Sequence, residues 1–360
     1  MTGRERLLTA LAGGEPDRVP ATVHQWQEYH LQRHMGGCDD LEAFRRVGLD
    51  ASLQVMPLQG ETSETWRISR LSMAVRDGII YTDYEISTPD GSLTYQTGED
   101  VYTRWMTVPP IKREEDVRLL RWRPVPGLDR SALAAIRAKV GDDGIVRTSL
   151  PGYQAGCWQD ACVLHGTEAM IYAAMDRPAW VHGFLEILLE WKLAYIAANL
   201  PGAAVDLVET GGGAGSNTVI SPALHQEFCL PYDQKLHAAI KAAGHRVVYH
   251  TCGGMSRILD LIKANGCDAS ETLSPPGVGG DITDPAAIKR ALSGLVLIGG
   301  LDQENVLTAG SPDGIRAEVE RLFAAYGEGG GYIMSVCDHF FQAPIANLRA
   351  YAEAARECRY

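Results

Sequence analysis

The 360-residue sequence lacks both a long hydrophobic run and an excess of positive charge. No stretch of about 18 consecutive apolar residues occurs, so we expect no membrane-spanning helix. Lys and Arg number 33 against 45 Asp and Glu, which gives a formal net charge of −12. A chain this negative is poorly suited to non-specific binding of nucleic acid or anionic membranes. We therefore expect neither as a partner.

The N-terminal segment also lacks the pattern of a secretory signal peptide. Arg4, Glu5 and Arg6 precede a very short apolar run, and Glu15 and Asp17 follow it. The eight cysteines do not form a disulfide framework in a chain of this length. We expect a cytoplasmic protein whose cysteines serve packing, metal binding or catalysis.

Tandem repeats and low-complexity segments are absent, and short apolar runs alternate with longer helical patterns. Most of these runs are apolar throughout, which is typical of parallel strands covered by helices on both faces. Ser-Pro or Asp-Pro pairs at 221–222, 284–285 and 311–312 indicate helix starts. The alternation predicts an α/β fold, a (β/α)₈ TIM barrel in one domain over residues 1–360, with a doubly wound open sheet as the alternative. The runs span residues 19–26, 49–56, 144–151, 205–210, 245–250, 267–273, 295–301 and 331–337.

Residues 65–108 break this pattern, because polar and apolar residues alternate there with a period of two. Asp77-Gly78 and Asp90-Gly91 are strong hairpin turn signals. We predict an antiparallel hairpin insertion that forms a lid or a flank on the barrel.

Three residues at predicted strand ends have the chemistry of a zinc site. His250 and Cys252 are two residues apart at the end of the fifth run, so both point to the same face. Cys337 ends the eighth run, and the carboxyl ends of barrel strands meet at one mouth. One imidazole and two thiolates would bind zinc with an open fourth position, and sulfur disfavours magnesium or calcium. The alternative is that the cysteines are small buried hydrophobes, as we expect for Cys157, Cys162, Cys229 and Cys267.

Two glutamates are candidate catalytic groups at the same mouth. Glu209 ends the fourth run, as an acid/base or a fourth zinc ligand, or else as a capping or ion-pairing carboxylate. Glu271 lies inside an apolar run, where an ionised side chain needs a partner. It either orients a zinc-binding histidine or forms an ion pair. Asp338 and His339 neighbour Cys337 and either support the zinc site or face solvent.

Substrate-binding candidates follow the first and seventh runs. His24, Gln25 and Trp26 close the first run and are candidates to line an apolar or aromatic pocket. Asp302 and Gln303 follow the seventh run and either orient a substrate or cap the loop.

With VVYHTCGG at 247–254, the distant Cys337 and this strand spacing, the chain resembles the uroporphyrinogen decarboxylase superfamily. The resemblance extends from RERLLTALAGGEPDRVP to FFQAPIANLRAYAEAARE. More narrowly, the chain is similar to the zinc-dependent corrinoid methyltransferase branch, typified by methylcobamide:coenzyme M methyltransferases. In that branch a His-x-Cys pair and a distant Cys hold the zinc, which implies His250, Cys252 and Cys337 as ligands here.

The sequence departs from true uroporphyrinogen decarboxylases at the start of the barrel. Those enzymes have an Arg-rich Met-Arg-Gln-Ala-Gly-Arg segment that binds substrate carboxylates, whereas the equivalent VPATVHQWQEYHLQ at 19–32 has no arginine. This difference argues against the alternative function, a metal-free decarboxylase. A non-catalytic relative that keeps only the fold is a third reading.

The resemblance implies methyl transfer between a corrinoid cobalt and a second substrate. That substrate is a thiol such as coenzyme M, a folate or a methoxylated compound, and the sequence does not choose the direction of transfer. The chain has no Asp-x-His-x-x-Gly corrinoid-binding motif, so the corrinoid (cobalamin) is expected on a partner protein or as free cofactor.

Overall fold

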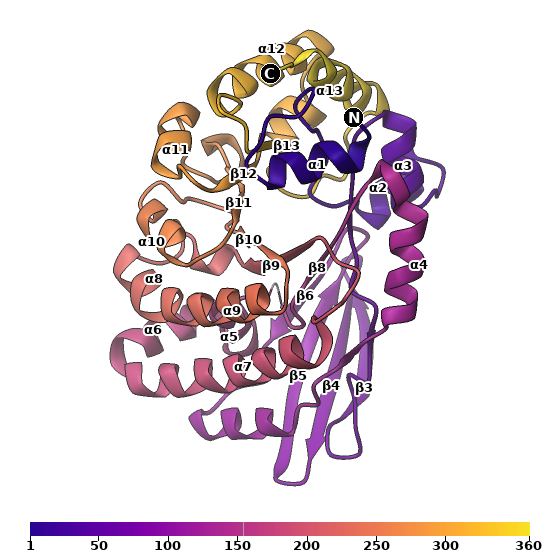
Figure 1. Cartoon of the computed structure of the whole chain (residues 1–360). Coiled ribbons are helices and arrows are strands. Elements are labelled where there is room, and N and C mark those ends of the chain that lie inside the picture. The colour runs from indigo at the N-terminus through magenta and orange to yellow at the C-terminus, as the bar shows by residue number, and fades with distance from the viewer. Residues whose placement is uncertain (154) are drawn as a thin grey trace.

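A curled parallel sheet forms the centre of the computed structural model, which describes residues 1–153 and 155–360. Its seven strands follow one another in chain order and are surrounded by helices (Figure 1). This arrangement confirms the predicted α/β barrel with one change, described below. The strands are β1 (Ala51–Gln54), β8 (Gly144–Ser149), β9 (Leu207–Gly211), β10 (Arg246–His250), β11 (Ala269–Thr272), β12 (Val296–Leu301) and β13 (Tyr332–Val336).

The eighth predicted strand, residues 19–26, is reduced to a short seam between β13 and β1. Met334 N–H donates to the Pro20 carbonyl and Thr22 N–H donates to the Met334 carbonyl, both at 2.9 Å. On the other side Asp50 N–H donates to the Ala21 carbonyl at 2.8 Å, but the Ala21 N–H is bound by the Asp50 carboxylate. Because Pro20 has no N–H and a side chain replaces a ladder bond, the segment closes the barrel without forming a full strand.

Helices connect most consecutive strands and cover the outside of the barrel (Figure 1). The three predicted helix starts are confirmed, because Ser221, Asp284 and Ser311 each accept a backbone N–H three residues ahead. Among the helices of the described residues, none has the length and apolar composition needed to cross a bilayer. The helices are α1 (Gly3–Leu11), α2 (Glu28–His34), α3 (Asp40–Val47), α4 (Arg130–Val140), α5 (Cys157–His165), α6 (Thr167–Asp176), α7 (Pro178–Asn199), α8 (Pro222–Phe228), α9 (Leu230–Ala242), α10 (Leu259–Ala264), α11 (Pro285–Ala291), α12 (Pro312–Tyr326) and α13 (Ile345–Glu357).

The predicted antiparallel insertion is confirmed as a four-stranded sheet that extends from the barrel between β1 and β8 (Figure 1). At its first turn Asp77 and Gly78 have φ values of 51° and 80°, the left-handed pair that a tight two-residue hairpin requires. All ten residues of the edge strand β3 are exposed. The strands are β3 (Arg67–Arg76), β4 (Ile79–Thr88), β5 (Gly91–Glu99) and β6 (Arg104–Val108), while β2 (Leu58–Gln59) pairs with β7 (Gly127–Leu128) beside the barrel.

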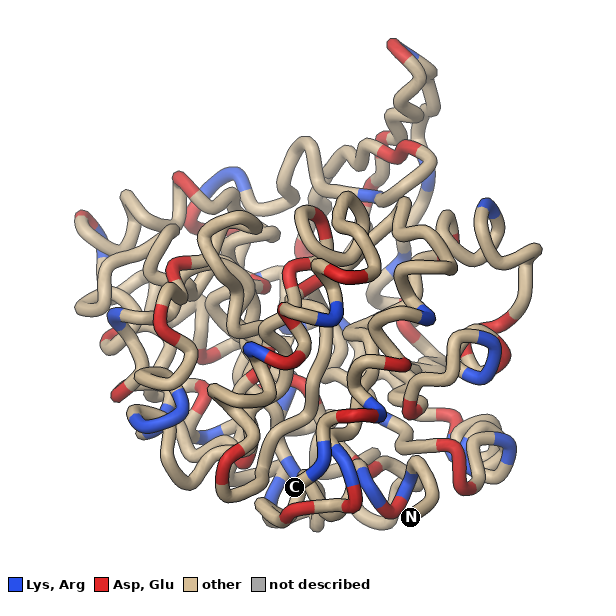
Figure 2. The backbone as a smooth tube through the Cα atoms, turned by 90° about the horizontal axis from the view of Figure 1, so that it is seen from above, with Lys and Arg blue, Asp and Glu red and all other residues tan. Residues whose placement is uncertain are grey.

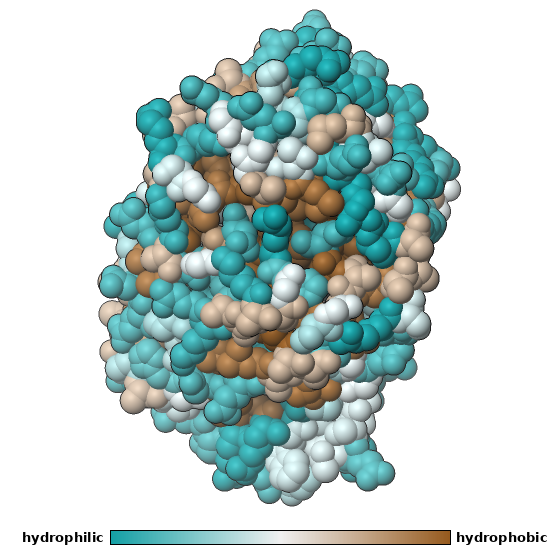
Figure 3. Space-filling model, in the orientation of Figure 1, coloured by the Kyte–Doolittle hydropathy of each residue, from teal (hydrophilic) through white to brown (hydrophobic). Residues whose placement is uncertain are grey.

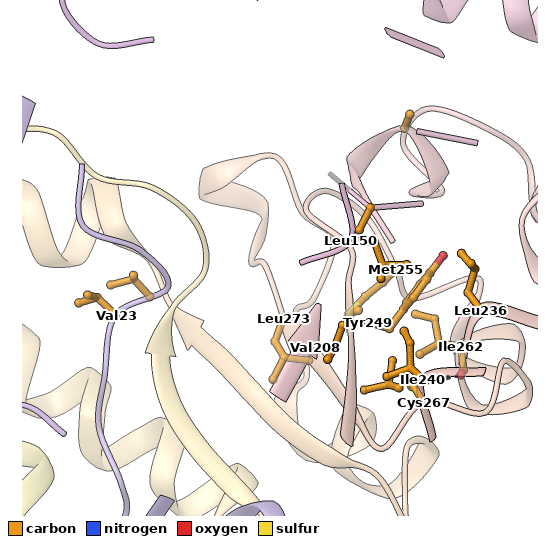
Figure 4. Close-up of a cluster of buried hydrophobic side chains, with 14 of the residues drawn as sticks. Val23, Leu150, Val208, Leu236, Ile240, Tyr249, Met255, Ile262, Cys267 and Leu273 are labelled. Atoms are coloured by element: carbon orange, nitrogen blue, oxygen red, sulfur yellow. Dashed lines mark hydrogen bonds between the residues drawn. The ribbon is translucent and has the colours of Figure 1, made fainter. Parts of the chain in front are cut away.

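The barrel interior has an apolar layer at its amino-terminal end. Inward side chains from most strands pack there against α1, which closes this end of the barrel. The intervening residues point outward, and Figure 4 shows Leu236 and Ile240 of α9 gathered with Ile262 around Tyr249 of β10. The apolar layer consists of Leu7, Ala10, Leu11, Ile145, Leu207, Val248, Ala269, Val296, Ile298 and Ile333.

Charge and hydropathy are distributed differently over the outside. Figure 2 shows basic and acidic segments interspersed along the described chain. On the face in Figure 3, apolar side chains gather in the hollowed middle, within a hydrophilic rim. The chemistry that distinguishes this chain is therefore concentrated at the other end of the barrel interior.

Candidate functional site

A layer of buried polar side chains lies one pleat above the apolar layer, at the carboxyl ends of the strands. Inward residues of a strand recur every two positions, so Ile145, Leu207, Val248 and Ala269 are each followed two residues later by a polar group. Backbone pairing places His250 directly opposite Glu271. The groups of this mouth layer are Arg147, Glu209, His250 and Glu271, and all four are buried.

Arg147 joins the two glutamates. Its Nη2 donates to Glu209 Oε2 at 2.7 Å and to both Glu271 oxygens at 2.8 Å. Burial alone would raise the pKa of Glu271, but Arg147 and the neighbouring histidines outweigh burial and lower it. The pKa of Glu209 is raised, mainly by burial and then by the Glu271 charge. The pKa values of the two carboxyl groups are therefore shifted in opposite directions, toward the ionised form for Glu271 and toward the protonated form for Glu209.

His250 is oriented by the same carboxylate. Its Nδ1 lies 3.1 Å from Glu271 Oε1, whereas its Nε2 is buried and has no hydrogen-bond partner among the described residues. Burial opposes a charged ring, but Cys252 and Glu271 outweigh it and raise the pKa of His250 well above its usual value. A buried ring nitrogen without a partner, opposite one held by a carboxylate, is the arrangement of a metal-binding histidine.

His24 packs against His250 with the ring centroids 4.9 Å apart. Its Nδ1 lies 3.8 Å from Glu271 Oε1, and burial lowers the pKa of His24 to about 3. His24, Glu209, His250 and Glu271 each offer a ligand atom within 4.8 Å of the others. The mouth layer thus contains neutral and anionic donors close enough to share one cation.

Cys252 and Asp338 form a second donor group with His250. One ligand atom of each lies within 4.8 Å of the other two. The Cys252 thiol lies against the backbone of the loop after β9, where a Cβ on Gly213 would approach its sulfur to 2.7 Å. A larger residue at position 213 would therefore displace the Cys252 thiol.

Cys337, the third predicted zinc ligand, is buried close to this group but outside it. No donor cluster found among the described residues includes its thiol. The sulfur instead lies 3.9 Å from the Leu273 carbonyl oxygen. Of the three predicted ligands, the structure brings His250 and Cys252 together and places Asp338 in the third position.

The backbone is strained where β11 ends. Thr272 and Leu273 have φ values of 82° and 52°, a left-handed conformation that non-glycine residues rarely adopt. Such strain persists only where the surroundings enforce it, and it is concentrated at functional sites. Here it turns the chain immediately after Glu271 and exposes the Leu273 carbonyl to Cys337.

The remaining predicted substrate residues have mixed surroundings. Gln25 lies at the mouth, where its Oε1 is 3.2 Å from His339 Nε2. Trp26 instead packs in the core, edge-on to Phe44 and Phe340.

Asp302 and Gln303, which follow the seventh run, also differ in their surroundings. Asp302 is committed to capping the turn after β12, because its carboxylate accepts from the Glu304 and Asn305 backbone N–H groups. Gln303 is buried, and its Oε1 has no partner among the described residues. Asp302 therefore follows the loop-cap alternative.

The sequence did not identify Arg147 as a site residue, and it left open whether Asp338 and His339 support the site or face solvent. Arg147 interrupts the apolar run GIVRTSLP at an inward position, the same signal that identified Glu271. His339 and Asp338 both have ligand atoms within 4.8 Å of a His24 ring nitrogen, which places them at the mouth, where both side chains are partly exposed.

The comparison with known families is decisive at this point. The family model for uroporphyrinogen decarboxylase (URO-D) matches residues 108–358, more than half of the chain. The chain belongs to the uroporphyrinogen decarboxylase family. The family resemblance inferred from sequence is therefore confirmed, and the chain is identified as that of an enzyme family.

Relatives and a structural neighbour of this family member cover most of its length. Uroporphyrinogen decarboxylase from Hydrogenovibrio crunogenus is 30% identical over 358 residues, 92% of this chain and 90% of that protein. The protein of the same name from Xanthomonas oryzae is 30% identical over 357 residues, with the same coverage. A methyltransferase from Methanosarcina mazei covers 99% of both chains with a TM-score of 0.69 and 18% identity. At that identity the likeness shows a shared fold.

Proposed function

We propose that this member of the uroporphyrinogen decarboxylase family is a zinc-dependent methyltransferase that moves a methyl group between a corrinoid cobalt and a second small molecule. The observation that carries this proposal is the His250 ring. Glu271 holds one ring nitrogen, and the other is buried without a described partner, close to Cys252 and Asp338. A carboxylate-oriented imidazole beside a thiol is a donor set suited to zinc.

The proposed ligands are His250, Cys252 and Cys337, with Asp338 as the competing third donor. A ring nitrogen of His250 and the Cys252 sulfur already belong to one cluster. Cys337 is buried next to Asp338 in the chain, with its thiol on a backbone carbonyl. Two sulfur donors would favour zinc more strongly than one sulfur and one carboxylate. Whether the third ligand is Cys337 or Asp338 is therefore the part of the proposal that an experiment can test most directly.

Zinc, when bound, supplies a Lewis acid that lowers the pKa of a thiol substrate or polarises a methyl-bearing atom. The chain's own residues prepare the site for this chemistry. Arg147 keeps Glu271 ionised, and Glu271 orients the His250 ring. Glu209 lies beside them and its pKa is raised, so we assign to it the exchange of a proton with the substrate heteroatom.

The second substrate in this proposal is a thiol such as coenzyme M, a folate or a methoxylated compound. The corrinoid arrives on a partner protein or as free cofactor. The Methanosarcina mazei methyltransferase supports the proposal at the level of the fold.

Metal analysis of the purified full chain is the first test. We expect near one zinc per chain in the wild type, with loss in Cys252→Ser and in Cys337→Ser. Cys267→Ser is the matched control, because Cys267 is also a buried thiol whose sulfur lies 3.8 Å from a backbone carbonyl. Retention of zinc in Cys337→Ser together with loss in Asp338→Asn would assign the third ligand to Asp338. A wild type that binds no zinc when reduced and supplied with the metal would refute the zinc mechanism.

The second candidate function is decarboxylation of a porphyrinogen, which the names of the sequence relatives favour. Such a substrate needs cations for its carboxylates, but Arg147 in the mouth layer is already bound to two glutamates. We expect the chain to demethylate methylcobalamin in the presence of a thiol and to leave uroporphyrinogen III unchanged. Conversion of uroporphyrinogen III without added metal would reverse this assignment.

A further inference from the structure

A cavity of about 230 Å³ lies between the inserted antiparallel sheet and the barrel, outside the mouth layer. Its walls come from β4, β5 and β6 of the insertion, the segment after β1, the loop after β8, and α7. None of the proposed zinc ligands lines it. The residues that give it its character are Trp66, Tyr95, Met106, Arg123, Tyr153 and Trp191.

Arg123 is the unusual member of this set. Its guanidinium carbon lies 3.7 Å from the centre of the Trp191 ring, in a stacked cation–π position. The Trp191 ring is held in place by its Nε1, which donates to the Pro124 carbonyl at 2.8 Å. No side-chain hydrogen bond or ion pair of Arg123 exists among the described residues. Burial lowers the pKa of Arg123, against the opposing effect of the Asp160, Tyr153 and Glu61 charges.

Three other buried or partly buried arginines each bind a carboxylate directly. Arg6 and Arg18 both bind Asp50, and Arg147 binds two glutamates. A desolvated charge without a counter-ion is costly, and proteins pair such groups as these three are paired. Arg123 forms no such direct ion pair among the described residues, and only the more distant charges of Asp160 and Glu61 act on it.

We propose that this cavity binds a small aromatic carboxylate, with the carboxylate on Arg123 and the ring against the aromatic walls. A cavity of roughly 150 Å³ suffices for benzene, so the volume here fits one ring with a carboxylate. The planar guanidinium matches a carboxylate with two parallel hydrogen bonds. Glu61 also lines the cavity and disfavours ligands with more than one negative charge.

Two tyrosines supply further donors. No hydrogen bond from the hydroxyl of Tyr95 or Tyr153 to another described residue is present. Burial raises the pKa of Tyr153, while the nearby Arg123 lowers it. The Tyr153 charge in turn raises the pKa of Tyr95, to about 12 together with burial. Both phenols are therefore neutral at pH 7, and the Tyr153 hydroxyl lies in the field of the Arg123 guanidinium.

The test is isothermal titration of the full chain with benzoate as the probe. We expect saturable binding by the wild type, and at least about tenfold weaker binding of the uncharged analogue benzamide. Arg123→Met should weaken benzoate binding by at least about tenfold, and Arg123→Lys by less, because the charge remains. Arg121→Met is the matched control, because Arg121 is two residues away, exposed, and paired with Asp90 at 2.7 Å.

Equal binding of benzoate and benzamide, or equal binding by the wild type and Arg123→Met, would overturn the proposal. So would a wild type that binds no benzoate at millimolar concentration. If Arg123→Met does not fold, Arg123→Lys and Tyr153→Phe replace it, and unchanged affinity in both variants would overturn the proposal. Removal of zinc with a chelator should leave benzoate affinity unchanged, which keeps this test independent of the proposed methyl transfer.

Discussion

Two levels of the barrel interior, one pleat apart on the same strands, have opposite character. On β10, Val248 belongs to the apolar layer that α1 closes, and His250 belongs to the polar mouth layer. Between them Tyr249 points outward to α9 (Figure 4). The same strand therefore contributes both kinds of side chain. Those near its amino-terminal end stabilise the barrel, and those at its carboxyl end belong to the candidate site. Variants two residues apart can therefore test whether the two levels are independent.

The largest expected effect comes from removing the cation of the mouth layer. Arg147→Met removes the guanidinium that binds both buried glutamates, which should cost about 3–5 kcal/mol of the free energy of unfolding. Urea denaturation measures this loss. Arg121→Met, which removes an exposed ion pair with Asp90, should cost less than about 1 kcal/mol. Equal losses in the two variants would show that the mouth layer does not depend on Arg147.

Leu207→Ala tests the apolar layer two residues before Glu209. Leu207 is buried, so its truncation leaves a cavity and should cost about 3 kcal/mol of the free energy of unfolding. Zinc content per folded chain should remain at the wild-type value, because no proposed ligand is touched. Loss of zinc from a still-folded Leu207→Ala would break the separation between the two levels.

Glu209→Gln should lower the reaction rate and leave the stability of the fold nearly unchanged. The amide keeps the shape of the side chain but cannot exchange a proton with substrate, so we expect the rate of methyl transfer to fall about 100-fold. The free energy of unfolding should change by less than about 1 kcal/mol, because Arg147 retains Glu271. A rate equal to that of the wild type would remove Glu209 from the chemistry.

Asp233→Asn tests whether a residue outside the mouth layer makes the free energy of unfolding depend on pH. Burial raises the pKa of Asp233, which lies beside Tyr249, from 3.8 to about 7. The unfolded chain loses this proton near pH 4 and the folded chain near pH 7, so the wild type loses stability as pH rises between them. The variant lacks this loss and should gain about 4 kcal/mol relative to the wild type between pH 4 and pH 8. Parallel curves of unfolding free energy against pH would contradict the assignment.

The smallest effect is expected on the inserted sheet. Val75 of the edge strand β3 is exposed, with a relative accessibility of 66%. Val75→Lys should change the free energy of unfolding by less than about 0.5 kcal/mol and leave zinc content unaltered. A larger loss would show that another molecule or part of the chain covers β3.

Much of the fold was predictable because the signals are local. Seven of the eight apolar runs became strands, and both Asp-Gly turns and the three helix caps lie where the residues indicated. The first run failed because Pro20 lacks an N–H and because the Asp50 carboxylate replaced a backbone partner. The second reason depends on residues 29 positions apart, which no local pattern reports.

The candidate site was predictable only in part. Alternation along β10 indicated that His250 and Cys252 share a face, but the position of Cys337 depends on the left-handed turn at Thr272 and Leu273. The ligand set remains a prediction until zinc is measured. The cavity at Arg123 had no signal in the sequence, because it forms only where the inserted sheet folds against α7.

The seam at Pro20–Thr22 is the part of the barrel wall that is held by the fewest backbone hydrogen bonds to its neighbours. Neighbouring strands are joined along a ladder, whereas three backbone bonds and one carboxylate hold this segment. Amide hydrogen exchange there should be fast relative to β10 and β11, since fewer bonds must open. His24 follows the seam by two residues and packs on His250. Opening of the seam would therefore also displace the His24 imidazole from His250.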